Sequence, residues 1–278
     1  MGNVVENVKK IKELIIKSEE EKVNILSLPE LCLTGASLYD AYREFDLLVD
    51  AENGLKDLIS YSENFDLAFT AGLPLRSEYG IYNAIALVKS GELLSINIKE
   101  NLKKYEKTIF ESKANGIVKA FDYSLDRKDY VNRISGLNIG ITIGEDEEMT
   151  IPKSLRLKEL GADVIIHPEA DPRYVFTDVI YIHTSAGPGE SSTDLVYTGS
   201  TYIFQDGKIF LDNPAIFPMD CYESEWEENF ENFTDEDYFM EKFPYLPEDE
   251  YDQDYLEQAL DIQALGLIQR MKAVGTEK

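Results

Sequence analysis

The sequence has 278 residues, of which 44% are hydrophobic and 11% aromatic, and its formal net charge is −26 at pH 7. This composition predicts a folded α/β protein with one large domain and an appendage, and it excludes general disorder. So acidic a surface repels nucleic acids and anionic membranes, and no apolar run approaches the roughly 18 residues that span a bilayer.

The first part of the chain predicts a helix, a strand and a second helix. Residues 4–20 place apolar side chains at helical spacing among Lys and Glu, which indicates an amphipathic surface helix. Residues 23–28 form an apolar run stopped by Pro29, which favours a buried strand that delivers Glu30 to its end. A second helix is predicted over residues 54–62.

A strand and a hairpin are predicted next. Residues 67–73 form another buried apolar run. Residues 81–88 and 93–98 flank a Ser-Gly pair that is typical of a hairpin turn, and the return strand ends at Lys99. Residues 101–130 are mixed and charged, and only loop with some helix is predicted there.

A buried strand followed at once by charge lies near the middle of the chain. Residues 137–143 are nearly continuous in apolar side chains, and the run ends at Gly144, before four acidic residues. In α/β folds the carboxyl ends of strands hold substrate and catalytic groups, so a nucleophile is expected there. A helix at 152–160 and a strand at 162–166 follow, and this alternation predicts an α/β layer fold.

Strand, hairpin and helix signals continue to the end of the chain. Residues 179–184 predict a strand, and residues 201–204 and 208–211 predict a hairpin that turns at an Asp-Gly pair. From 220 to 254 the composition shifts to Asp and Glu, which predicts a solvated segment held down by its aromatic side chains. Apolar spacing over residues 256–271 predicts a closing helix.

Four stretches resemble segments of a known family. The nitrilase, or carbon-nitrogen hydrolase, superfamily carries its catalytic glutamate and lysine in segments similar to LPELCLTG at 28–35 and INIKENLKKYEKTIFE at 96–111. A more specific resemblance, to the glutaminase domain of glutamine-dependent NAD+ synthetase, is found in SAGPGESSTDLVYTGSTYIFQDGKIF at 185–210. The linker helix that follows that domain is similar to PYLPEDEYDQDYLEQALDIQALGLIQRM at 244–271.

The resemblance implies a fold and a domain organisation. The superfamily folds as a four-layer αββα sandwich, and the same α/β fold is expected here, with an acidic segment and a linker helix at the C-terminus. Residues 1–218 are expected to form the nitrilase-like glutaminase domain, and residues 219–278 the acidic segment and linker helix of the same domain. The family also implies a homo-oligomer and contact with an NAD+ synthetase domain.

The resemblance also implies catalytic roles. In the family a cysteine thiol attacks the glutamine carboxamide, a glutamate takes up the thiol proton, and a lysine ammonium stabilises the oxyanion. Glu30 and Lys99 match the glutamate and the lysine, whereas Gly144 stands at the nucleophile's position, so the thioester route is closed there. Substrate-binding positions are implied for Tyr105, Glu145, Glu169 and Asp171.

Other positions depart from the family as well. Ala36 stands where a tyrosine is usual, and residues 167–171 replace a serine-containing loop, so the whole pocket is expected to have decayed. Cys32 lies close to Glu30 but is interpreted as a small buried hydrophobe rather than a substitute nucleophile. No metal site and no cofactor are predicted, because His167 and the acidic residues around it match no known ligand spacing.

The leading hypothesis is a glutaminase-like domain that has lost thiol-dependent amidase activity and has a structural or regulatory role in NAD+ biosynthesis. Glutamine or another small carboxylate is a candidate ligand, and two cysteines, too few for a disulfide framework, favour a cytoplasmic protein. One alternative is an active amidase on a substrate other than glutamine that uses water activated by Glu30. Another is the N-terminal piece of a longer synthetase, because the sequence ends before that family's ATP-binding Ser-Gly-Gly loop. The sequence also begins after the family's usual first strand, so either the sheet is expected to lack a strand or the true start is expected to lie upstream.

Overall fold

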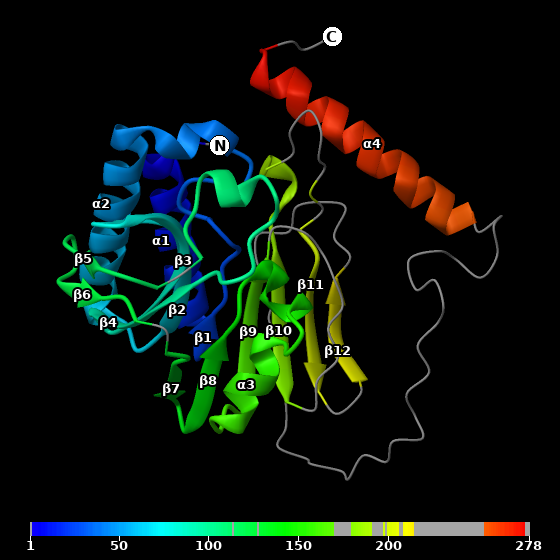
Figure 1. The fold of residues 1–278 in the computed structure, drawn as a ribbon. Coiled ribbons are helices and arrows are strands. Elements are labelled where there is room, and N and C mark those ends of the chain that lie inside the picture. The colour runs from blue at the N-terminus through cyan, green and yellow to red at the C-terminus, as the bar shows by residue number, and fades with distance from the viewer. Residues whose placement is uncertain are drawn as a thin grey trace.

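Two β-sheets packed face to face form the centre of the protein, and helices cover their outer faces (Figure 1). The computed structural model describes residues 2–112, 114–126, 128–169, 179–190, 197, 199–205, 208–213 and 253–275. Residues 220–252 of the predicted acidic segment, which include Cys221, lie outside the described residues, as does Asp171. None of the helices in the described part of the chain combines the length and the apolar surface that crossing a membrane requires.

The first sheet has the order β1-β2-β3-β4 and carries two helices on its outer face. β1 runs parallel to β2, and β2, β3 and β4 form an antiparallel meander. The strands are Ile25–Leu26, Ala68–Ser77, Gly80–Lys89 and Glu92–Ile98, and the helices are α1 (Val4–Glu20) and α2 (Phe45–Tyr61). Apolar residues of α1 and α2 pack with those of β2 and β3 in one core cluster.

The second sheet has the order β12-β11-β10-β9-β8-β7. β8, β9 and β10 are parallel to one another, and antiparallel strands flank them on both sides. The strands are β7 (Val131–Ile134), β8 (Leu137–Ile141), β9 (Val164–Glu169), β10 (Ile180–Ser185), β11 (Thr201–Gln205) and β12 (Lys208–Asn213). The carboxyl ends of the three parallel strands therefore meet at one edge of this sheet.

The packing of side chains defines four layers. Ile85 and Leu87 of β3 pack against Ile139, Ile141 and Ile166 of the second sheet, so the inner faces of the two sheets share one apolar core. On the outer face of the second sheet, α3 (Lys153–Glu159) covers a further cluster. The order helices, sheet, sheet, helix confirms the predicted αββα sandwich.

Short elements and one long helix complete the described chain. The small ribbon consists of β5 (Ile117–Val118) and β6 (Tyr123–Ser124). Single 3-10 turns occur at Tyr39–Arg43, Ser62–Asn64, Glu106–Thr108, Gly144–Glu148 and Pro188–Glu190. The helix α4 (Gln253–Ala273) contains the predicted closing helix, and it lies near the turn at Pro188–Glu190 (Figure 1).

Three predicted boundaries in the first half were wrong. The predicted strand 67–73 continues through Pro74 to Ser77 as β2, and local contacts explain the other two. The predicted helix 54–62 begins earlier, at Phe45, because Gly54 lies inside α2 rather than before it. A Cβ at Gly54 would lie 2.9 Å from Val8, so the glycine lets α1 and α2 approach closely. The predicted strand 23–28 is reduced to Ile25–Leu26, because the N–H of Leu28 bonds to the Thr70 hydroxyl (2.9 Å) instead of a strand carbonyl.

Gly72 in β2 is packed against the turn that carries Glu30. A Cβ there would clash with the backbone nitrogen of Leu31 and lie 2.9 Å from the carbonyl oxygen of Pro29. Because backbone atoms cannot move aside cheaply, Gly72→Ala should lower the free energy of unfolding by at least about 2 kcal/mol. Chemical denaturation measures this. Gly187→Ala is the control, because its Cβ meets nothing within 4 Å, and a similar loss there would contradict the steric explanation.

Candidate functional site

Three chain segments that are far apart in sequence converge at the ends of strands from both sheets. Glu30 lies in the turn after β1, Lys99 follows β4, and Gly144 follows β8. Lys99 Nζ lies 2.8 Å from Glu30 Oε1. The structure therefore brings together the three positions that the sequence singled out.

Lys99 forms the centre of a buried ion-pair network. Its Nζ lies 2.8 Å from Glu30, 3.0 Å from Glu106 and 2.5 Å from Glu145. The Lys99 side chain is only 1% exposed, and each of the three carboxylates is 5% exposed or less. Burial disfavours the charge on Lys99, but the three carboxylates outweigh this effect and hold the pKa of its ammonium well above the ordinary value.

A second cation joins the network at Glu145. Lys103 Nζ lies 2.7 Å from Glu145 Oε1, so this carboxylate is shared by two ammonium groups. Burial acts to raise the pKa of Glu145, but Lys99 and Lys103 prevail and lower it to about 2. For Glu106 the balance is reversed, because burial raises its pKa and Lys99 only partly offsets the rise.

Gly144 is the residue around which the base and the ammonium are arranged. It opens a 3-10 turn with φ +46°, in the left-handed region that favours glycine. A Cβ at Gly144 would lie 3.0 Å from Lys99 Nζ and 3.4 Å from Glu30 Oε2. A side chain at this position would therefore contact both the ammonium and the carboxylate, which are already paired with each other.

Three residues of the network, Asn83, Lys103 and Glu106, were missed by the sequence analysis. Asn83 donates from Nδ2 to Glu30 Oε1 at 2.6 Å, and the buried Glu106 accepts from Lys99. Glu106 follows Lys99 by seven residues in a stretch already singled out, so its charge was a usable signal. Asn83 had no local signal, because only the register of β3 places it beside Glu30.

Asp146 ties the turn after β8 to the segment after β4. Its Oδ1 accepts hydrogen bonds from the backbone N–H groups of Glu100 (2.8 Å) and Asn101 (2.7 Å), and Lys153 Nζ lies 3.6 Å from Oδ2. The side chain is fully buried. Burial raises the pKa of Asp146 to about 6, although Lys153 and the two N–H groups act in the opposite direction.

The other predicted substrate-binding positions are spread out. Tyr105 is 39% exposed, its ring packs on Tyr39 with centroids 5.5 Å apart, and burial and the Glu106 carboxylate raise the pKa of its phenol. Glu169 is buried at the end of β9 beside His167. Asp171 lies outside the described residues.

Ala36 and Cys32 both lie in the loop that follows Glu30. The N–H of Ala36 donates to Glu190 Oε2 at 2.8 Å, which joins this loop to the turn at Pro188–Glu190. Cys32 Sγ accepts from the N–H of Gly72 at 3.3 Å, and burial raises the pKa of its thiol to about 12. Cys32 is therefore held as a neutral thiol, consistent with the interpretation as a small hydrophobe.

Comparison with known protein families defines the class of this protein. Residues 2–198 match the family described as carbon-nitrogen hydrolase. This match covers most of the chain, and the chain belongs to that family. The predicted resemblance to the nitrilase superfamily is thereby confirmed.

Among curated proteins, the relatives are glutamine-dependent NAD(+) synthetases. The Mycobacterium bovis enzyme is 23% identical over 343 residues, covering 100% of this chain and 50% of the enzyme. The Aquifex aeolicus enzyme is 28% identical over 178 residues, covering 63% of this chain and 29% of the enzyme. The chain thus spans half or less of the length of these relatives.

Solved structures agree on the fold. A glutamine-dependent NAD(+) synthetase from Cytophaga hutchinsonii superposes with a TM-score of 0.63 at 22% identity, covering 78% of this chain and 39% of that chain. An amidase of the nitrilase superfamily from Nesterenkonia AN1 superposes with a TM-score of 0.58 at 16% identity, covering 76% and 81%. The nitrilase-like sandwich predicted from the sequence is therefore confirmed.

Removal of the central cation should destabilise the fold. Lys99→Met leaves three buried carboxylates without their shared partner, and we expect a loss of about 3 kcal/mol or more in the free energy of unfolding at pH 7. The loss should be smaller at pH 5, because carboxylates that lack the cation take up protons more readily. Denaturation at both pH values measures this.

Lys89→Met is the matched control for that experiment. Lys89 also pairs with a carboxylate, Asp66, but the Asp66 side chain is 90% exposed. Its removal should change the stability by less than about 1 kcal/mol. Equal losses for the two variants would show that the buried network contributes nothing beyond an ordinary surface ion pair.

The raised pKa of Asp146 predicts a distinctive pH dependence. Because the folded state holds its proton up to about pH 6 while the unfolded state releases it near pH 3.8, Asp146 should lower the stability as the pH rises through this window. Asp146→Asn should remove this fall, which amounts to about 3 kcal/mol. Denaturation of both proteins from pH 4 to about pH 6.5 tests this, and parallel stability curves would contradict it.

Proposed function

We propose that this chain is a glutaminase-like domain of the NAD+ synthetase type that does not perform thiol-dependent amide hydrolysis. The observation that carries the proposal is Gly144. The residue that faces both Glu30 and Lys99 has no side chain, and a Cβ there would lie 3.4 Å from the carboxylate and 3.0 Å from the ammonium. Glu30 and Lys99, the groups that would support a thioester mechanism, therefore lie close to a residue that has no sulfur atom.

A fold relative indicates what the site lacks. The Nesterenkonia amidase has an active-site cysteine to which the acetamide moiety of fluoroacetamide adds covalently. In thiol-dependent amide hydrolysis, which differs from that addition, the thiolate bonds to the carbonyl carbon and the carbon–nitrogen bond then breaks. A carboxylate takes the thiol proton and delivers it to the departing amine, and an ammonium stabilises the oxyanion. Glu30 and Lys99 fit the last two roles here, but the described Cys32 is a neutral thiol that bonds to Gly72.

The retained acid and base fit a structural role. Each charge of Lys99, Glu30, Glu106 and Glu145 has an opposite charge within 3.0 Å. Replacing one member of such a buried network leaves an unpaired charge in the interior and destabilises the fold. Each member therefore contributes to stability even when no reaction depends on it. The network therefore stabilises the junction of the two sheets without a nucleophile.

The relatives suggest where such a domain acts. Because they are glutamine-dependent NAD(+) synthetases about twice as long, we place this chain in NAD+ biosynthesis, in contact with a synthetase domain in the same or another polypeptide. Assembly into a homo-oligomer in the cytoplasm, and binding of glutamine or another small carboxylate near Lys99, belong to the same proposal. The role is structural or regulatory.

The direct test is release of ammonia from glutamine. The wild-type chain should give no turnover above the blank, while the Cytophaga hutchinsonii synthetase serves as the positive control. Gly144→Cys should restore little activity, because φ is +46° and the new Cβ would crowd Lys99 Nζ. Clear wild-type turnover would overturn the proposal, and strong rescue by Gly144→Cys would show that the pocket is intact.

Two further variants separate the possible causes. Gly144→Ala introduces the same Cβ as Gly144→Cys but no thiol. If both variants lose about 1 kcal/mol of stability, the cause is the positive φ at this position and the contact of the Cβ with Lys99, not the sulfur. If the wild type does release ammonia, Glu30→Gln distinguishes the mechanisms. Loss of that activity would support an amidase that activates water through Glu30.

A further inference from the structure

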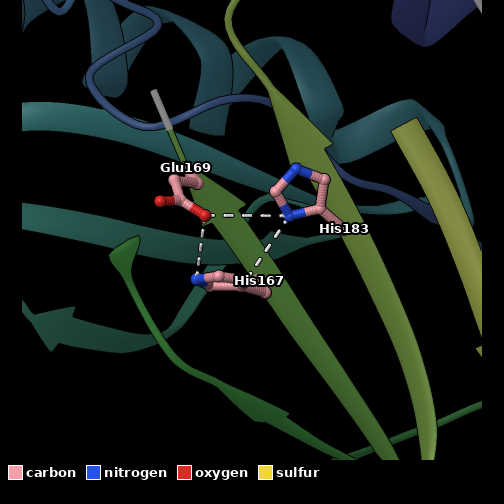
Figure 2. A group of neighbouring side chains, drawn as sticks. All are labelled: His167, Glu169 and His183. Carbon is pink, nitrogen blue, oxygen red and sulfur yellow. Dashed lines mark hydrogen bonds and ion pairs between the residues drawn. The ribbon is translucent and has the colours of Figure 1, made fainter. Parts of the chain in front are cut away.

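Both histidines of this chain lie side by side in the interior. The sequence contains two histidines, His167 on β9 and His183 on β10, and parallel pairing places them opposite each other. Glu169 follows His167 by two positions on the same strand and lies on the same face (Figure 2). All three side chains are 1% exposed or less.

The nitrogen and oxygen atoms of this cluster are close together. His183 Nδ1 lies 3.4 Å from His167 Nδ1 and 4.0 Å from Glu169 Oε2, and His167 Nε2 lies 3.6 Å from the same oxygen. One ligand atom from each residue can be chosen so that all lie within 4.8 Å of one another. In a tetrahedral zinc site, bonds near 2.0–2.1 Å separate neighbouring ligand atoms by roughly 3.4 Å.

Aromatic packing fixes the orientation of both rings. The ring of His183 stacks on Tyr202 at 4.6 Å with an interplanar angle of 15°. The ring of His167 meets Tyr181 edge-on at 5.4 Å. Two tyrosine rings therefore fix the orientation of the two imidazoles.

A hydrogen bond to the backbone fixes the tautomer of His167. Its Nε2 lies 3.0 Å from the carbonyl oxygen of Gly144, which can only accept, so Nε2 carries the proton. The lone pair of His167 is then on Nδ1, which faces Nδ1 of His183. Metal-binding histidines commonly donate their second N–H to a carbonyl or a carboxylate in this way.

The protonation state also suits metal binding. Burial lowers the pKa of His167, and burial together with His167 lowers the pKa of His183 well below the ordinary value. Neutral imidazoles are the form that binds a metal ion.

We propose that His167, Glu169 and His183 form a binding site for one transition-metal ion of the Zn²⁺ class. The ligand atoms would be Nδ1 of each histidine and a carboxylate oxygen of Glu169. Two imidazoles and one carboxylate favour Zn²⁺ and similar ions over Mg²⁺ or Ca²⁺, which prefer oxygen ligands. A bound cation would draw the three groups together.

This site departs from the sequence prediction of no metal, and it does not depend on the proposed function. His183 was not considered, because residues 167, 169 and 183 match no familiar ligand spacing. Only the parallel register of β9 and β10 unites them. The proposal needs no cysteine at 144, although the carbonyl of Gly144 holds the His167 ring.

The test is titration of the tag-free chain with Zn²⁺ alone. We expect one ion per chain with a dissociation constant below about 10 µM, and about 10 mM Mg²⁺ should not displace it. Because the chain has two histidines, an imidazole nitrogen NMR spectrum contains only two rings, and Zn²⁺ should shift Nδ1 of both. Binding that leaves both rings unshifted, or that Mg²⁺ displaces, would overturn the proposal.

Matched variants separate a metal site from a structural pair of histidines. His167→Gln keeps an N–H that can reach the Gly144 carbonyl, and His183→Asn keeps an amide near the position of Nδ1, but each removes an imidazole ligand. Either change, or Glu169→Gln, should weaken Zn²⁺ binding at least about 100-fold. Asp57→Asn, at a carboxylate that is 55% exposed, should leave it unchanged. Equal affinity in the histidine variants would overturn the proposal.

Discussion

The buried ammonium of Lys99 is the interaction on which the centre of this protein depends. An isolated charge in the interior is strongly unfavourable, and three carboxylates within 3.0 Å make this one tolerable. The carboxylates come from the turn after β1, the segment after β4 and the turn after β8. Electrostatic compensation therefore requires both sheets to be in place, and it couples their edges.

Gly144 lies beside this buried ion-pair network. The chain belongs to the carbon-nitrogen hydrolase family, and the residue beside both Glu30 and Lys99 is a glycine in a left-handed conformation. Because Lys99 is already neutralised by its carboxylates, the network is complete without a reacting group.

The turn at Gly144–Glu148 connects two clusters of different chemistry. Through Glu145 and Asp146 it holds the lysine networks on one side, and through the carbonyl of Gly144 it holds His167 on the other. A change at this turn would thus be felt both by the ion pairs and by the histidine cluster. This coupling passes through direct contacts of described residues and needs no longer pathway.

The sequence by itself determined the α/β class, most of the strands and the importance of Glu30, Lys99 and Gly144, because apolar runs, turn residues and local motifs are written in consecutive residues. The sequence did not predict the start of α2, because Gly54 lies within the helix, where it allows α1 to pack closely, and does not mark a helix end. It also missed Asn83, Glu106 and His183 as members of clusters. Only the tertiary structure decided these, because strand register and burial bring together residues whose separation in the chain carries no signal.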